Sequence, residues 1–162
     1  MRPHFSRQLH LSISCVALLG CLCVPAHGET AGDTTKAGTI KIVHGDVRIA
    51  DARGERTLSP GDSLTQADHV ITGADGAASM VLRDGTTMML GPRSLVDLKT
   101  FTYNSTTEQG SLVVSVLRGS MRMISGLIAH NNPQAVAVTT RTATIGVRGT
   151  DFIVEVDDEA KQ

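Results

Sequence analysis

The sequence predicts an all-β protein, in which short strands form a single compact domain built as a β-sandwich or an irregular β-solenoid. Apolar and polar residues alternate with a period of two through most of the chain, and turns rich in Gly, Asp and Pro recur between these runs. No window after residue 28 has the periodicity of an amphipathic helix. Together these patterns indicate stacked or rolled β-structure, and the uneven turn spacing argues against a true short repeat.

Residues 1–28 are predicted to be a signal peptide. Arg2 and Arg7 make the start basic, and no acidic residue occurs before Glu29. The apolar run that follows, residues 11–24, is shorter than the roughly 20 residues that a membrane-spanning helix needs. A small residue at Gly28 completes a signal-peptidase site, so we expect cleavage after it.

Two other fates of this segment are open. Residues 18–21 resemble a lipobox, so Cys21 is an alternative site of lipidation, which would give an outer-membrane lipoprotein. The segment could also stay uncleaved as an anchor. All three cysteines, Cys15, Cys21 and Cys23, lie within it. Cleavage after Gly28 would therefore leave no disulfide, thiol nucleophile or thiolate metal site.

Three further regions follow the leader. Residues 29–38 have almost nothing to bury and are predicted to be a linker, residues 39–156 are the predicted β domain, and residues 157–162 are an acidic tail. Without the leader the chain has 13 basic and 16 acidic residues, a net charge of −3. This balance argues against nucleic-acid binding, which needs a basic face, and against adhesion to anionic lipid by charge alone.

The strands of the first half are separated by turns that the sequence marks clearly. His44-Gly45 is predicted to turn between strands at 39–43 and 47–49, and Ser59–Asp62 is another turn. Asp84-Gly85 predicts a tight hairpin, because Gly accepts the positive φ that such turns require. The remaining strands of this half are expected at residues 69–72, 77–83, 86–90 and 94–99.

The second half continues in the same way. Strands are expected at residues 111–117, 120–124, 135–140 and 151–156, with Arg118-Gly119 as a turn and residues 126–134 as an exposed loop. After the leader the only aromatic residues are Phe101, Tyr103 and Phe152. The core must therefore be filled by aliphatic side chains and methionine, which suits closely packed strands better than a wide ligand cavity.

No catalytic or metal-binding set stands out. The three histidines of this region are far apart, the aspartates beside glycine are those that build β-turns, and methionines alternating within strands predict core filling rather than soft-metal binding. These residues are His44, His69 and His130; Asp62, Asp75 and Asp84; and Met80, Met88, Met89, Met121 and Met123. Nucleophile-elbow and phosphate-loop motifs are missing from the sequence. We therefore expect no enzyme, no cofactor and no metal.

The most distinctive stretch is Thr139–Val156, which contains Val147, Arg148, Gly149, Thr150 and Phe152. It resembles the closing signature of FecR domains, and shorter upstream elements match the rest of that family pattern in order. Those elements include Gly45, Leu58, Gly61, Asp62, Leu64, Val70, Gly73, Leu82, Asp84, Gly85, Thr86, Leu117 and Gly119. The resemblance spans residues 39–156 and implies the β fold.

The resemblance also implies a role in the cell envelope. FecR-type regulators pass a signal from an outer-membrane transporter to a sigma factor, using a cytoplasmic segment and a membrane helix. Neither is expected here, so direct sigma-factor control is not predicted and the β domain remains as an interaction module. The first hypothesis is a periplasmic or exported protein that offers strand edges or loops to another envelope protein.

The alternative hypothesis is a structural protein associated with glycan or peptidoglycan. Few aromatic residues argue against it, because sugar rings usually stack on Trp or Tyr. Within the closing motif, Arg148 and Asp151 are the predicted partner-binding residues. The other interpretation makes the motif a fold-closing corner, in which Gly149 allows tight backbone geometry, Thr150 closes the turn and Phe152 anchors the last strand.

Overall fold

Strands joined into one curled sheet make up most of the computed structural model, which describes residues 36–52, 54–148 and 151–157. This confirms the predicted all-β fold. The strands are β1 (Lys36–His44), β2 (Val47–Asp51), β3 (Gly54–Thr57), β4 (Ser63–Thr65), β5 (His69–Thr72), β6 (Ala77–Leu82), β7 (Thr87–Leu90), β8 (Leu95–Tyr103), β9 (Gly110–Ile124), β10 (Val136–Thr139), β11 (Thr144–Gly146) and β12 (Asp151–Val156). Two short helical elements, α1 (Leu127–Asn131) and η1 (Pro133–Ala135), follow β9.

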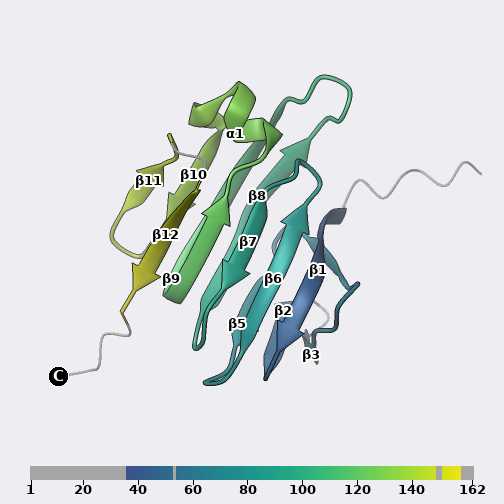
Figure 1. Cartoon of the computed structure of the whole chain (residues 1–162), viewed down its shortest axis with the longest axis vertical. Coiled ribbons are helices and arrows are strands. Elements are labelled where there is room, and N and C mark those ends of the chain that lie inside the picture. The colour runs from purple at the N-terminus through teal and green to yellow at the C-terminus, as the bar shows by residue number, and fades with distance from the viewer. Residues whose placement is uncertain (1–35, 53, 149–150, 158–162) are drawn as a thin grey trace, which may run out of the picture. The chain divides into compact units, whose positions relative to one another are not determined.

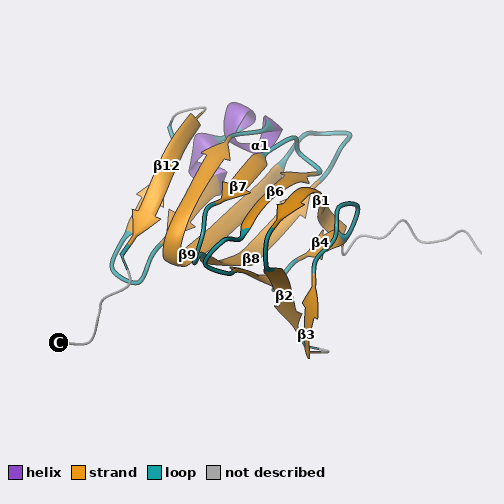
Figure 2. Ribbon diagram, turned by 60° about the horizontal axis from the view of Figure 1, so that its bottom comes forward, coloured by secondary structure: helices purple, strands orange, loops and turns teal. Residues whose placement is uncertain are grey.

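The long strand β9 belongs to two layers at once. Its first half pairs with β8 and β10, and its second half pairs with β7 and β12. One layer therefore runs β4-β1-β6-β7-β9-β12, and the other runs β3-β2-β5-β8-β9-β10-β11. The views in Figures 1 and 2 show the layers stacked, with α1 at one end of them. All neighbours are antiparallel except β9 and β10.

The turn predicted at Arg118-Gly119 is wrong, because β9 continues through it. Arg118 pairs with Leu95 of β8, whereas Gly119 already pairs with Val156 of β12. Gly119 has a φ of +77°, so the backbone bends there without reversing its direction. The hydroxyl of Ser94 lies against the bend, accepting a hydrogen bond from Ser120 N (3.0 Å) and donating to Ser120 O (3.0 Å).

The core lies between the layers and is aliphatic, as predicted. Met80, Met88, Met121 and Met123 are each at most 1% exposed. Met89 differs from the prediction: it is half-buried on the outer side of β7, because its neighbours Met88 and Leu90 take the inward positions. The period-two pattern thus selects which methionines enter the core.

The predicted turns at Gly45, Gly61 and Gly85 are confirmed, each with a positive φ. In the Ser59–Asp62 turn, Asp62 Oδ2 accepts a hydrogen bond from Ser59 N (3.0 Å) and one from Arg56 Nη1 (2.9 Å). The backbone hydrogen bond, followed by the arginine, lowers the pKa of Asp62.

Some short elements were missed. The predicted loop at 126–134 contains α1 and η1, and Ile128 and Ala129 are buried rather than exposed. Strand β1 starts at Lys36, inside the predicted linker, and β3, β4 and β11 were not predicted. Each missed element has five residues or fewer, which is too few for a periodic pattern to show.

The β6–β7 hairpin does more than turn the chain. Asp84 is buried, and its carboxylate accepts hydrogen bonds from Thr86 N (3.1 Å) and Thr86 Oγ1 (2.7 Å). Thr86 Oγ1 in turn accepts one from Gly126 N (3.0 Å), and the carbonyl of Asp84 accepts one from Leu127 N (2.9 Å). The hairpin therefore fixes the start of α1.

Candidate functional site

An open cleft between β11 and β12 is the candidate site. The two strands belong to opposite layers, because β10 and β11 extend the layer of β9's first half and β12 extends the layer of its second half. Within the part of the chain that the structure describes, β11 pairs only with β10 and β12 pairs only with β9. Each strand thus keeps one edge without a strand partner, and the sandwich is open between these edges.

Apolar side chains line the middle of the cleft. Ile145 of β11 lies opposite buried Val138, so it faces inward, yet it remains 36% exposed. Phe152 of β12 lies opposite buried Met123 and is only half-buried. These residues surround a cavity of about 230 Å³ together with Val147 and Val154. The core face of both layers is therefore incompletely covered here.

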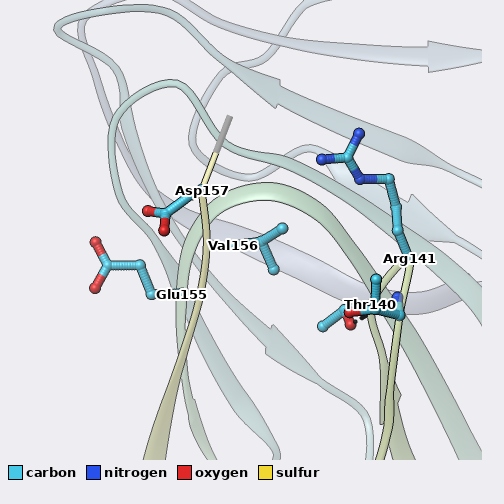
Figure 3. A pocket seen from close by; sticks show the side chains of 6 residues that line it. Thr140, Arg141, Glu155, Val156 and Asp157 are labelled. Atoms are coloured by element: carbon cyan, nitrogen blue, oxygen red, sulfur yellow. Dashed lines mark hydrogen bonds between the residues drawn. The ribbon is translucent and has the colours of Figure 1, made fainter. Parts of the chain in front are cut away.

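Toward the turn between β10 and β11, this turn and the end of β12 border a second hollow, of about 450 Å³. Figure 3 shows this end: Val156 points toward the turn, and Glu155 points away from it. Thr140 holds the turn, because its Oγ1 accepts hydrogen bonds from Thr142 N (3.3 Å) and Ala143 N (3.1 Å). This wall of the cleft is thus formed by a defined turn.

Arg148 stands at the other end of the cleft. It is exposed, whereas its neighbour Val147 is buried. Both residues line the central cavity. They also line a further cavity of about 240 Å³, whose other lining residues include Ala129 and His130 of α1. Arg148 therefore projects at the junction of two hollows and is not buried in a corner.

Asp151 lies on the outer side of β12, where it forms an ion pair with Arg122 of β9. Arg122 Nε donates to Asp151 Oδ1 (2.9 Å), and Arg122 Nη2 donates to Asp151 Oδ2 (2.5 Å). The hydrogen bonds, with the charge of the partner, lower the pKa of Asp151 and raise that of Arg122. Ile153, two residues along the strand, is 68% exposed.

The ion pair predicts a pH dependence that involves Asp151. A lowered pKa means that the pair stabilises the fold above the unfolded-state pKa, and that this contribution is lost as the pH falls through the folded-state pKa. We expect Arg122→Gln to raise the Asp151 pKa toward 3.8, measured by carboxyl-carbon NMR titration. Arg83→Gln changes an exposed arginine at the β6–β7 turn, whose guanidinium donates to Lys36 O, and should leave the midpoint unchanged. An unaltered Asp151 midpoint in R122Q would contradict the pairing.

The predicted site residues are thus close in sequence but have different surroundings. Arg148 is at the rim of the cleft, and Asp151 is engaged by Arg122 on the outer face. Gly149 and Thr150 lie outside the described residues. Sequence reasoning missed Ile145 and Ile153. The signal for Ile153 was present, because residues 152–154 are apolar in succession, which gives β12 apolar side chains on both faces.

A separate polar cluster lies on β8, away from the cleft. Asp97 of β8 is buried, and its carboxylate is hydrogen-bonded to His69 and forms an ion pair with Lys99 Nζ (2.7 Å). The sequence did not predict this grouping. Among the described residues, no group of three or more His, Cys, Asp or Glu side chains could hold a metal ion. None of the described helices is long and apolar enough to cross a membrane.

The fold and the cleft define the class: an all-β sandwich domain that is open between β11 and β12. Within this class, the chain belongs to the FecR protein family, whose model matches residues 68–162. The family is associated with signalling and regulation at the cell envelope. The match includes β12 and the closing motif, whereas the upstream elements around Gly45 and Gly61 lie before it. No curated protein and no solved structure matches the chain.

Proposed function

We propose that this chain is a non-enzymatic signalling module of the cell envelope that binds an extended segment of another envelope protein. The segment adds as a strand along the free edge of β12, over the open cleft. The single observation that carries this proposal is that β11 and β12, which lie on either side of an apolar cleft, each have one edge with no strand partner among the described residues. Export through the leader at residues 1–28, with cleavage after Gly28 or, as the alternative, lipidation of Cys21, is part of the proposal.

The chemistry of a free edge supports strand addition. Alternate backbone N–H and C=O groups of an edge strand point away from the sheet and are available to a further strand. The partly covered side chains of Ile145 and Phe152 would accept alternate apolar side chains of that strand, which gives specificity. A strand placed here would also complete the cover of the core.

Charge suggests which segment fits. Arg148 has no ion pair with any described residue, and it projects at the rim next to the central cavity. An acidic residue beside the apolar stretch of the partner would pair with this guanidinium. Glycan binding is less well supported, because Phe152 is the only aromatic residue that lines the cleft where it is described.

The test uses two exposed isoleucines of similar exposure. Ile153→Lys places a charge on the free edge of β12, and Ile42→Lys places one on β1, away from the cleft. Ile153 is 68% exposed and Ile42 is 62% exposed, so both variants should fold. In pull-downs from envelope extracts, we expect the wild type and I42K to capture the same protein and I153K to lose it, at least about tenfold, by quantitative mass spectrometry.

Muramidase treatment of the extract separates the two kinds of partner. A protein partner should remain bound after treatment, whereas a glycan partner should be released. Equal capture by I153K and I42K would overturn strand addition at β12, and loss of capture on muramidase treatment would favour the glycan-associated role.

A further inference from the structure

A row of four residues crosses the outer face of the layer that contains β2, β5, β8 and β9, with an arginine at each end. Arg48 of β2 pairs with Ile71 of β5, and Ile71 pairs with Leu95 of β8. Leu95 pairs with Arg118 of β9, immediately before the bend. All four residues are half-buried. The two arginines are 70 positions apart in sequence, and only this register places them in one row.

A third arginine joins them from the turn before β8. Arg93 has a φ of +53°, a left-handed backbone that is uncommon for a residue with a side chain. Its backbone N–H donates to Gly73 O (2.9 Å), which fixes the turn against the end of β5. Arg48, Arg93 and Arg118 line one cavity of about 230 Å³, together with Ile71, Thr72, Gly73 and Ala74.

The charges of the three arginines are only partly balanced. Arg48 lies 3.3 Å from Asp46 through its Nε and 2.5 Å from Glu55 through its Nη1. Arg93 and Arg118 form no ion pair with a carboxylate of any described residue. Two guanidinium groups with uncompensated charge therefore border the same cavity.

The buried donors of the cluster are also incompletely satisfied. The Nε atoms of Arg48 and Arg118 are buried and have no hydrogen-bond partner among the residues that the structure describes. The Arg48–Asp46 distance suits an ion pair, but its geometry is not that of a hydrogen bond. Apolar cover for side chains such as Ile71 and Leu95 is a common role of arginine methylene groups on a sheet. It does not explain three guanidinium groups in one hollow, because a buried donor without a partner costs free energy.

We propose that this cavity binds a phosphate-type oxyanion, held by Arg93 and Arg118 with Arg48 at its side. A phosphate monoester carries a charge of about −1.5 to −2 at neutral pH, which matches two unpaired guanidinium groups, whereas a single arginine is enough for a carboxylate. The cavity is smaller than the roughly 300–1,000 Å³ of drug-sized ligand sites, so it takes the phosphate group and not a whole cofactor. The source is free phosphate or the phosphomonoester headgroup of a lipid.

The first arm of the test titrates inorganic phosphate at constant ionic strength and follows the arginine Nε–H signals by NMR. We expect saturable shifts of the Arg118 and Arg48 Nε–H signals. Arg118→Gln should weaken phosphate binding at least about tenfold, the effect of losing a hydrogen bond to a charged group. Arg83→Gln is the matched control, because Arg83 is exposed and, within the described part of the chain, its guanidinium donates only to Lys36 O (3.5 Å). It should bind phosphate like the wild type.

The second arm uses vesicles of phosphatidylcholine with and without phosphatidic acid. Binding to phosphatidic acid that R118Q abolishes assigns a lipid headgroup, and binding of free phosphate alone assigns a soluble source. The proposal is overturned if neither probe gives a saturable response, or if R118Q and R83Q weaken binding equally, which would be general electrostatic attraction. Ile153→Lys should bind phosphate normally, so this result is independent of the strand-addition proposal.

Discussion

Replacing Gly119 with alanine is expected to lower the free energy of unfolding by about 2–5 kcal/mol. This range is the sum of two costs, ~1–2 kcal/mol for a side chain on a left-handed backbone and ~1–3 kcal/mol for overpacking. Gly119 has a φ of +77°, and a Cβ there would lie 2.5 Å from Ser94 Cα and 2.9 Å from Arg93 O. Backbone atoms such as these cannot move aside without shifting the turn before β8. Because the bend in β9 joins the two layers, the strain would reach both.

Two other glycines separate the causes of this effect. Gly85 also has a positive φ (+85°), but a Cβ there meets nothing within 4 Å, so Gly85→Ala should cost only the backbone strain of about 1–2 kcal/mol. Gly146 has an open position and no positive φ, so Gly146→Ala should stay within about 0.5 kcal/mol of the wild type. Urea unfolding of the three variants should rank them in this order. A G119A protein as stable as G146A would contradict the bend as described.

Replacing Asp84 with alanine is expected to cost about 2–4 kcal/mol, because buried donors left without an acceptor cost ~1–3 kcal/mol each. The substitution removes the acceptor of both Thr86 N and Thr86 Oγ1. It also removes the group that orients the Thr86 hydroxyl, which accepts a hydrogen bond from Gly126 N. The desolvation cost of the buried carboxylate is relieved at the same time, which keeps the loss below the full sum. The measurement is the urea unfolding midpoint and slope.

A double-mutant cycle with Thr86 tests the network itself. Thr86→Val removes the hydroxyl, so D84A and T86V should be clearly non-additive, with the double variant less destabilised than the sum of the two singles. Asp84→Asn, which keeps one carbonyl oxygen for Thr86 N, should fall between the wild type and D84A. Additive single effects would show that the two side chains act independently.

The sequence was sufficient where structure depends on near neighbours. Alternation placed Met121 and Met123 on the buried face of one strand, and Asp-Gly at 84–85 marked a hairpin that the structure contains. The same local reasoning failed at Gly119. A glycine with positive φ is compatible with a turn or with a bend inside a strand, and only the partners of β9 distinguish them.

The candidate site was predicted in part. Arg148 was singled out and is exposed at the rim of the cleft, and Asp151 was singled out but is paired with Arg122. The cleft itself was not predictable from the sequence. It exists because β11 and β12 extend opposite layers and, among the described residues, do not pair with each other. Short strands such as β11 carry too few residues to reveal their pairing.

The sequence by itself determined the all-β class, the aliphatic core and the faces of its longer strands, because these follow from the period-two geometry of a strand. The tertiary structure alone decided that β9 spans two layers, that Arg48 and Arg118 lie in one row, and that Ile145 and Phe152 face an open cleft. The physical reason is register: contacts between strands far apart in the chain depend on which backbone groups pair, and a local sequence pattern does not reveal which distant strands pair.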